Sequence, residues 1–177
     1  QVLGQPPRDV KTKARVGYLP EETYQYPYLT AEETLDFYGK LFDLDDAARR
    51  QRIEQLLDMI GLRHARKRAV GEFSKGMARR IGLAQALIND PELVILDEPT
   101  AVLTPQEADE LFRIMRDLAA RGVSIVFITH KLKEVLAVAD RITVIRRGKT
   151  VGTTTPAEAG VFAVPIFEPE HLWRRLR

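Results

Sequence analysis

The stretch ELVILDEPT, residues 92–100, limits the fold of this chain more than any other part of the sequence. Residues 92–96 predict a short strand, because a mostly apolar run follows the turn-forming cluster of residues 89–91. Such a strand is typical of a parallel sheet that is covered on both faces, and ligands of these sheets bind just beyond the carboxyl ends of the strands. Two carboxylates, Asp97 and Glu98, follow the strand at once. We therefore expect them to lie at a ligand site.

Two adjacent acids at a strand end allow a division of chemical roles. The aspartate can hold Mg²⁺ on a phosphate group, directly or through water. The neighbouring glutamate can orient or deprotonate an attacking water molecule. A structural interpretation is also open, in which Asp97 and Glu98 simply lead into the next helix and Pro99 ends the strand. For an isolated pair of acids the structural interpretation is preferred, so the rest of the chain has to decide.

The composition restricts the classes of function. Hydrophobic residues make up 45% and charged residues 29% of the chain, as is ordinary for a globular domain. The net charge is only +2, so composition offers no argument for nucleic-acid binding. Without cysteine the chain has neither disulfides nor thiolate metal ligands, and no apolar run approaches the roughly 18 residues of a membrane-spanning helix. Any association with a membrane is expected to come through a partner protein.

Predicted strands and helices alternate along the chain, which indicates an α/β fold with a mostly parallel sheet. The apolar pattern predicts strands over residues 14–19, 92–96, 123–129, 141–147 and 150–154. It predicts helices after Thr30, with Glu33 completing a capping box, over residues 45–60, after Ser74, and over residues 106–120 and 132–139. We expect one domain over residues 1–154, with a helical subdomain at about 27–88, and a tail of unknown structure over residues 155–177.

A predicted helix N-terminus and a histidine after a strand are two further candidates for a ligand site. Ser74 is the predicted N-cap of a helix that begins with Lys75 and Gly76, and the free N–H groups and dipole of a helix N-terminus favour anions such as phosphate. Most serine-capped helices nevertheless bind nothing. His130 follows the strand over residues 123–129, at a position where a purely structural histidine is equally common. Neither feature decides the function by itself.

The order of three motifs is more informative than any one of them. FSKGM opens a predicted helix at residues 73–77, VILDEP ends a strand at residues 94–99, and ITH ends the next strand at residues 128–130. This order closely resembles the nucleotide-binding subunit of ATP-binding cassette (ABC) transporters, over roughly residues 14–152. FSKGM resembles the signature motif of that family, VILDEP resembles its Walker B motif with the catalytic glutamate, and His130 matches its switch histidine.

Two other segments fit the same family. YLPE at residues 18–21 resembles the Q-loop, with Glu21 where glutamine is usual, and AVLT at residues 101–104 occupies the position of the D-loop. The resemblance implies a P-loop NTPase-like ABC ATPase domain, with ATP and Mg²⁺ as cofactors. It implies that Asp97 supports Mg²⁺ and that Glu98 polarises the attacking water.

The resemblance also assigns roles to the remaining candidate residues. His130 would contact the γ-phosphate and fix the geometry of the water. Ser74, Lys75 and Gly76 would contact the γ-phosphate of a nucleotide held mainly by a second ABC ATPase subunit, since two subunits of this family, as a homo- or heterodimer, enclose two ATP molecules. Glu21 would sense the γ-phosphate and Mg²⁺, although a carboxylate in place of an amide removes a hydrogen-bond donor and adds charge.

The implied partners are that second ATPase subunit and a transmembrane permease subunit, with no nucleic acid. The implied location is cytoplasmic, peripheral on the inner face of the plasma membrane. Residues before about 93 resemble drug and multidrug exporters, whereas the later residues resemble sugar and nucleoside importers. The direction of transport and the substrate are therefore not assigned from the sequence.

The phosphate-binding loop of this family, G-x-x-x-x-G-K-[ST], does not occur in the sequence. The Gly-Lys-Thr at residues 148–150 has Thr143 in place of the first glycine and lies in a predicted hairpin, so we interpret it as a turn. In the family the loop lies upstream of the Q-loop. We therefore expect a truncated ABC ATPase that binds ATP poorly by itself. The alternative is a non-catalytic interaction module that docks on an intact ABC ATPase or transporter subunit.

Overall fold

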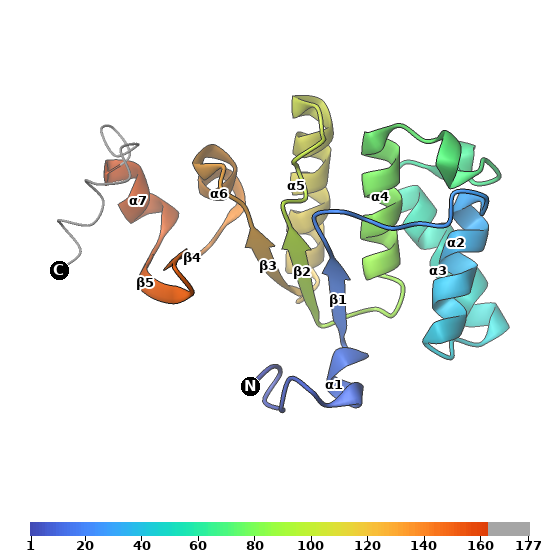
Figure 1. Ribbon diagram of the computed structural model, residues 1–177, viewed down its shortest axis with the longest axis horizontal. Coiled ribbons are helices and arrows are strands. Elements are labelled where there is room, and N and C mark those ends of the chain that lie inside the picture. The colour runs from blue at the N-terminus through green and yellow to red at the C-terminus, as the bar shows by residue number, and fades with distance from the viewer. Residues whose placement is uncertain (163–177) are drawn as a thin grey trace. The chain divides into compact units, whose positions relative to one another are not determined.

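The protein folds into two compact units, of which the first ends at Ile128 and the second begins at Thr129 (Figure 1). The structure is a computed structural model that describes residues 1–162. The division falls directly after the third strand. The extent of the domain predicted over residues 1–154 stays a prediction. The candidate residues are therefore distributed over two units, which are described separately.

The first unit is built on a three-stranded parallel sheet in the order β1-β2-β3. The strands are β1 (Val16–Leu19), β2 (Leu93–Asp97) and β3 (Ser124–Ile128). Leu19 pairs with Leu96, and Leu96 pairs with Phe127, so the three strands end at the same edge of the sheet. The predicted α/β fold with a parallel core is confirmed; Asp97 is the last residue of its central strand and Glu98 follows it.

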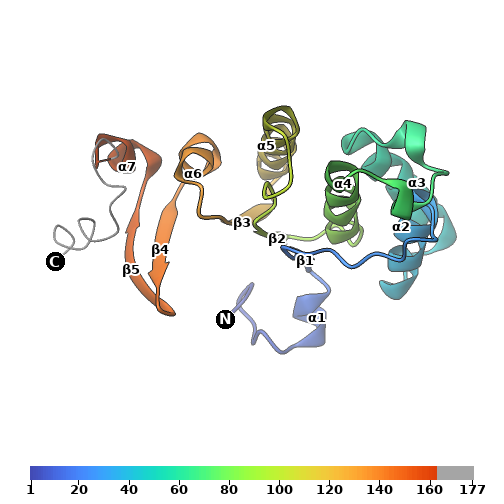
Figure 2. The same ribbon diagram turned by 45° about the horizontal axis from the view of Figure 1, so that its top comes forward.

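One face of the sheet is covered by two helices that lie on the same side of it in Figures 1 and 2, α4 (Lys75–Ala86) and α5 (Pro105–Ala120). Gly17 of β1 lies so close to α4 that an added Cβ would overlap the carbonyl oxygen of Ala86. The Phe112 ring of α5 meets the Phe127 ring of β3 edge to face, with 6.2 Å between the ring centroids. This face forms the core beneath the candidate site.

The opposite face of the sheet is open. Tyr18, Val126 and Ile128 on this face are 52%, 46% and 47% exposed. The expectation that the sheet is covered on both faces is therefore wrong for the part of the chain that the structure describes. The physical reason is that α4 and α5 pack on the same face, so that alternate residues are buried in β2 and half-buried in β3.

A helical subdomain lies between β1 and β2 in the sequence. Its elements are α2 (Ala31–Leu41), α3 (Asp46–Met59), and the 3₁₀ helices η1 (Arg63–Ala65) and η2 (Val70–Glu72), followed by α4. Thr30 and Glu33 form the predicted capping box, and Gly61 follows α3 with a φ of +67°. The Arg49 guanidinium donates a 2.6 Å hydrogen bond to Asp36 and so joins α3 to α2.

The second unit contains a helix and an antiparallel hairpin, α6 (Leu132–Val138), β4 (Ile142–Arg146) and β5 (Lys149–Thr154). Arg147 and Gly148 between the strands have φ values of +49° and +73°, as in the tight turns that suit hairpins. The Gly-Lys-Thr segment thus lies at a hairpin turn, as predicted, with Gly148 in the turn and Lys149 at the start of β5. Among residues 1–162, every helix is too short or too polar to span a lipid bilayer.

Two short helices occur where the apolar pattern predicted none, α1 (Val10–Lys13) and α7 (Pro156–Phe162). Each begins with a local cap: Asp9 accepts from the Thr12 N–H at 2.7 Å, and Thr155 accepts from the Glu158 N–H at 3.4 Å. One or two helical turns are too short for a periodic pattern to develop. The rest of the expected tail, residues 163–177, lies outside the described residues.

We expect Gly17→Ala to destabilise the first unit, because the added methyl group meets the main chain of α4 at Ala86. Overpacking of this kind costs about 1–3 kcal/mol in the free energy of unfolding. Urea unfolding measures the change. Ser124→Ala, at an exposed position of β3, is the matched control and should change stability by about 0.5 kcal/mol or less. Equal stabilities of the two variants would contradict the packing of α4 against β1.

Candidate functional site

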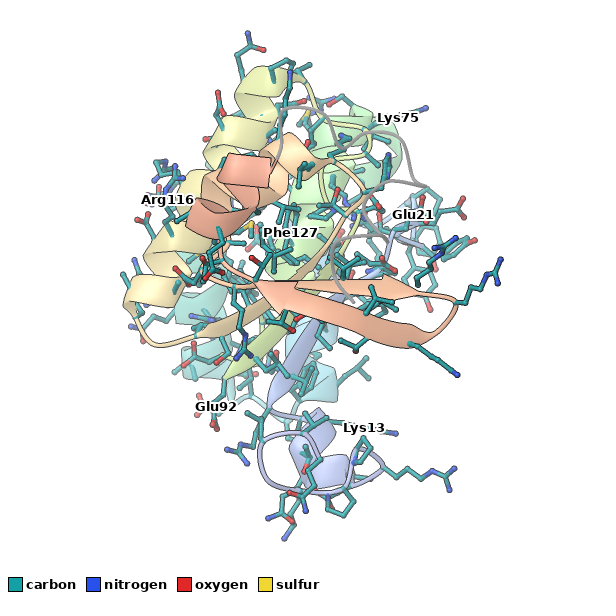
Figure 3. All side chains as sticks on the ribbon, turned by 90° about the vertical axis from the view of Figure 1, so that its left-hand side faces the viewer. Lys13, Glu21, Lys75, Glu92, Arg116 and Phe127 are labelled. Atoms are coloured by element: carbon teal, nitrogen blue, oxygen red, sulfur yellow. The ribbon has the colours of Figure 1, made fainter. Side chains whose placement is uncertain are left out.

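The first unit brings three of the predicted site residues to one edge of the sheet. Glu21 lies just beyond β1, while Asp97 ends β2 and Glu98 follows it. Because β1 and β2 are parallel neighbours, these positions lie at the same edge. In Figure 3, Glu21 and Lys75 lie toward the opposite end of the sheet from Glu92, which precedes β2. The tertiary structure thus joins two segments that are more than 70 residues apart in the sequence.

Asp97 is half-buried, and its carboxylate lies on the open face of the sheet. The Tyr18 hydroxyl, on the neighbouring strand, donates to Asp97 Oδ2 at 3.4 Å. The side chain of Glu21, beyond the same edge, is exposed. Mg²⁺ commonly binds one or two carboxylates and takes its other ligands from water and phosphate oxygens. The half-buried carboxylate of Asp97 could supply one such ligand, and Glu21, beyond the same edge of the sheet, is the candidate for a second.

The backbone of Glu98 is held in a strained conformation. Its φ is +43°, in the left-handed region that residues other than glycine avoid. The Glu98 N–H donates to the Ile128 carbonyl of β3 at 2.9 Å, and the Glu98 carbonyl accepts from the Ala101 N–H at 3.1 Å. Strained residues of this kind are concentrated at functional sites, where the surrounding structure holds them. Glu98 is therefore more constrained than a residue that merely links a strand to a helix.

The N-terminus of α4 has the predicted geometry. The Ser74 hydroxyl accepts from the Met77 N–H at 3.1 Å, which confirms Ser74 as the N-cap, and the side chains of Ser74 and Lys75 are exposed. Gly76 is buried, and an added Cβ would overlap the carboxylate of Glu107 at the start of α5. The structure thus supplies a packing reason for Gly76, which the sequence interpretation had related only to phosphate.

Arg79 is a residue of the site that the sequence analysis missed. It lies on α4 and is only 4% exposed. Its guanidinium donates to the Asp97 carbonyl at 2.5 Å, to the Pro99 carbonyl at 3.2 Å and to the Glu21 carbonyl at 2.9 Å, and also to the Pro20 carbonyl. One side chain therefore joins the segment after β1 to the segment after β2.

The environment of Arg79 is unusual for a cation. Burial lowers its pKa, and the negative charges of Asp97, Glu21 and Glu98 oppose this shift. The guanidinium of an arginine nevertheless stays protonated inside proteins. A sequence signal existed: Arg79 lies three residues from Gly76 and four from Leu83, on the buried side of α4, where arginine is rare unless it is paired.

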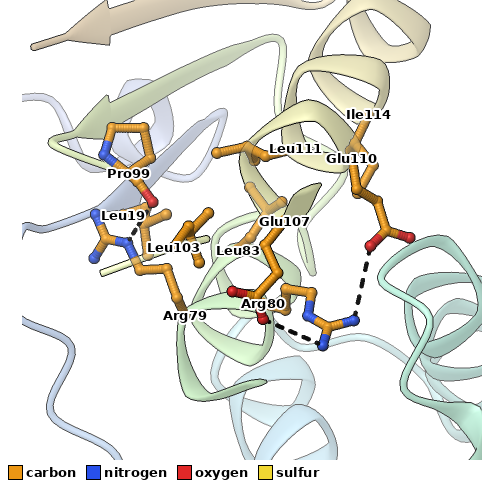
Figure 4. A pocket seen from close by; sticks show the side chains of 10 residues that line it. All are labelled: Leu19, Arg79, Arg80, Leu83, Pro99, Leu103, Glu107, Glu110, Leu111 and Ile114. Atoms are coloured by element: carbon orange, nitrogen blue, oxygen red, sulfur yellow. Dashed lines mark hydrogen bonds and ion pairs between the residues drawn. The ribbon is translucent and has the colours of Figure 1, made fainter. Parts of the chain in front are cut away.

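The pocket beside Arg79 is too small for a nucleotide. It lies between α4 and α5, and its lining includes Leu19, Arg79, Arg80, Pro99 and Glu107 (Figure 4). Its volume of about 10 Å³ leaves room for about one water molecule. Figure 4 shows Arg79 directed to Pro99, whereas Arg80 is directed to Glu107 and Glu110. Neighbouring arginines on α4 thus have different partners.

His130 is the one predicted catalytic residue that lies in the second unit. It is exposed and follows β3 by two residues. Thr129, the residue between them, accepts from the Lys131 N–H at 3.1 Å. The contact of His130 with a γ-phosphate remains a prediction.

The parallel sheet and its helices have the fold of ABC ATPase domains, a P-loop NTPase-like α/β fold. A solved structure of an ATP-binding subunit of an ABC transporter superimposes with a TM-score of 0.76 at 26% identity, covering 94% of this chain and 70% of that one. The structure of cbiO1 from Clostridium perfringens, part of the ABC transporter complex cbiONQ, gives a TM-score of 0.75 at 22% identity, covering 85% and 61%.

The sequence comparisons agree with the fold. The family described as ABC transporter matches residues 1–101. An ABC transporter ATP-binding protein of Synechocystis is 43% identical over 159 residues, which is 89% of this chain and 45% of that protein. The linearmycin resistance ATP-binding protein of Bacillus subtilis is 36% identical over 147 residues, 82% of this chain and 47% of that protein. The chain belongs to the ATP-binding proteins of ABC transporters.

The relatives are longer than the matched region and differ in their named roles. The chain spans about half the length of the Synechocystis and Bacillus relatives. A glucose import ATP-binding protein of Haloferax volcanii is 49% identical over 108 residues, which is 61% of this chain and 20% of that protein. Similar proteins thus include one named for resistance and one named for import, and neither name transfers to this chain.

The strain at Glu98 can be measured with Glu98→Gly and Glu98→Ala. Both variants lose the carboxylate, but only glycine adopts a φ of +43° without a steric cost, so the glycine variant should be more stable by about 1 kcal/mol in urea unfolding. The control pair is Asp97→Gly and Asp97→Ala, within β2, for which alanine should be the more stable residue. The same order of stability at both positions would contradict the strained conformation of Glu98.

Proposed function

We propose that the complete protein is the ATP-hydrolysing, energy-coupling subunit of an ABC transporter, and that residues 14–152 contain its Q-loop, signature, Walker B and switch positions. Family membership supports ATP binding and transport as the general class. The observation that carries the proposal further is the position of Asp97 and Glu98. They lie at the carboxyl end of the central strand of a parallel sheet, where ligands of such sheets bind.

In the proposed reaction a water molecule attacks the γ-phosphate of ATP in line with the leaving oxygen. Glu98 orients this water and accepts its proton. Asp97, together with Glu21 at the neighbouring strand end, would hold Mg²⁺, which offsets the charge on the phosphate oxygens when it is bound. The hydroxyl of Tyr18 lies 3.4 Å from Asp97 Oδ2, on the same face of the sheet.

The start of α4 acts toward a second subunit in this proposal. Ser74 and Lys75 are exposed at a helix N-terminus, where N–H groups and the helix dipole favour a phosphate. Gly76 allows α5 to lie close to that N-terminus. His130 contacts the γ-phosphate. The partners are a second ABC ATPase subunit, identical or different, and a transmembrane permease, which holds the protein at the cytoplasmic face of the plasma membrane.

The 177 residues supply acids and a histidine but few donors for phosphate oxygens, since the phosphate-binding loop does not occur among them. We therefore expect the isolated 177-residue chain to bind Mg·ATP more weakly than about 1 mM. Isothermal titration calorimetry with the Glu98→Gln variant of this chain, which avoids turnover, measures the affinity. Binding in the micromolar range would contradict this prediction, because it would require a phosphate cradle within these residues.

In the complete protein, Glu98→Gln should lower kcat for ATP hydrolysis by about 10²–10³-fold while ATP still binds, because the amide cannot take a proton from the water. Steady-state ATPase assays measure the effect. The control is Glu92→Gln, the same substitution at the opposite end of β2, where Glu92 forms an exposed ion pair with Arg15. Its kcat should stay within about twofold of the wild type.

Two outcomes would reject the proposed roles. Full activity of Glu98→Gln would exclude Glu98 as the residue that activates water. A complete protein without ATPase activity that nevertheless changes the rate of an intact ABC ATPase subunit would favour the non-catalytic interaction module instead.

A further inference from the structure

We propose that Arg79 is the positioning residue of this site. Its guanidinium holds the strained backbone of Glu98, and it also binds the main chain of the segment that carries Glu21. The inference rests on the proposed function of Glu98 as the residue that orients the attacking water. It concerns an arginine within α4 that touches neither nucleotide nor metal in this proposal and acts only through the main chain.

Hydrogen bonds from Arg79 and β3 hold the main chain on both sides of Glu98. Arg79 Nη2 donates to the Asp97 carbonyl at 2.5 Å, and Arg79 Nε donates to the Pro99 carbonyl at 3.2 Å. The Glu98 N–H donates to the Ile128 carbonyl at 2.9 Å. The peptide group that enters Glu98 is therefore held at its oxygen by α4 and at its nitrogen by β3. The Pro99 carbonyl, one residue beyond Glu98, is held by the same guanidinium.

The backbone strain at Glu98 has to be maintained by its surroundings. A residue with a side chain and a φ of +43° relaxes unless its surroundings prevent it. The bonds from Arg79 and β3 fix both ends of the short segment that contains Glu98, so that rotation of its backbone breaks at least one of them. The direction of the Glu98 side chain thus depends on Arg79, although the two side chains need not meet.

Arg79 also binds a second pair of carbonyl acceptors, which lie beyond β1. Arg79 Nη1 donates to the carbonyls of Pro20 and Glu21, the latter at 2.9 Å. A guanidinium is a rigid planar fork, so its donors keep constant relative positions. A lysine at this position retains the charge but has a single nitrogen, which cannot reach four carbonyls on two segments. Arg79→Lys therefore separates the positioning role from the charge.

The structure supplies a matched control in Arg52 of α3. Arg52 Nη2 donates to the Leu87 carbonyl at 2.7 Å and to Asp90 Oδ1 at 2.9 Å, at the C-terminal end of α4. Like Arg79, it donates from its guanidinium to a main-chain oxygen, but its side chain is 20% exposed and it lies at the opposite end of α4 from Ser74. Arg52→Lys thus removes a bond between a guanidinium and a carbonyl at the end of α4 without a connection to Glu98.

The test compares Arg79→Lys, Arg79→Gln and Arg52→Lys in the complete protein. We expect each Arg79 variant to lower kcat for ATP hydrolysis by about tenfold or more, with KM for Mg·ATP within about threefold of wild type, since misplacement of a reacting group affects the chemical step. We expect the Glu98 amide to exchange with solvent at least about tenfold faster in these variants, by NMR without nucleotide, because its local opening becomes easier. Arg52→Lys should leave both quantities within about twofold.

The outcomes are distinct. Unchanged exchange at the Glu98 amide in both Arg79 variants would overturn the inference, and so would a loss of kcat that Arg52→Lys reproduces. If the wild-type protein hydrolyses no ATP, the proposed function fails, and hydrogen exchange alone then decides whether Arg79 holds Glu98. Arg79→Gln serves as the second variant if Arg79→Lys does not fold, since the neutral amide avoids an unpaired buried charge.

Discussion

The hydrogen bonds from the Arg79 guanidinium to the carbonyls beyond β1 and β2 are the interaction on which the site depends. They join α4 to two strand ends that come from distant parts of the sequence. A buried cation is costly unless it is fully hydrogen-bonded, and here main-chain oxygens satisfy it while three carboxylates lie near enough to stabilise its charge. The same contacts hold Glu98 in a conformation that its side chain disfavours.

The packing of the sheet explains why this arrangement is accessible. Both α4 and α5 cover one face, and their contacts with Gly17 and Phe127 form the rigid base of the site. The other face presents the Asp97 carboxylate together with the exposed side chains of Tyr18 and Val126. The covered face is rigid, and the open face is accessible to a ligand. A ligand can therefore reach Asp97 and Glu98, which supports the proposed nucleotide site.

Several site residues have both a packing role and a proposed chemical role. Gly76 leaves room for the carboxylate of Glu107, which an added Cβ would displace, and Ser74 begins its helix as an ordinary N-cap. These structural roles are compatible with the roles that family membership suggests. The same cap that begins the helix also fixes the position of the N–H groups that would bind a phosphate. A substitution at Gly76 would therefore change both the packing against Glu107 and any binding of phosphate. The roles of Glu98 and Arg79 can be tested separately, through the rate of ATP hydrolysis and the hydrogen exchange of the Glu98 amide.

The sequence by itself determined most of the strands and helices, the parallel core, the capping of α2 and α4, the hairpin turn and the family, because these follow from local pattern and from motif order. It did not show that one face of the sheet is open, since a continuous apolar run predicts a strand covered on both faces. It also missed the bonds of Arg79 and the left-handed backbone of Glu98. Only the tertiary structure decided these, because they depend on main-chain oxygens brought together from β1, β2 and α4, and a main-chain carbonyl has no sequence signature.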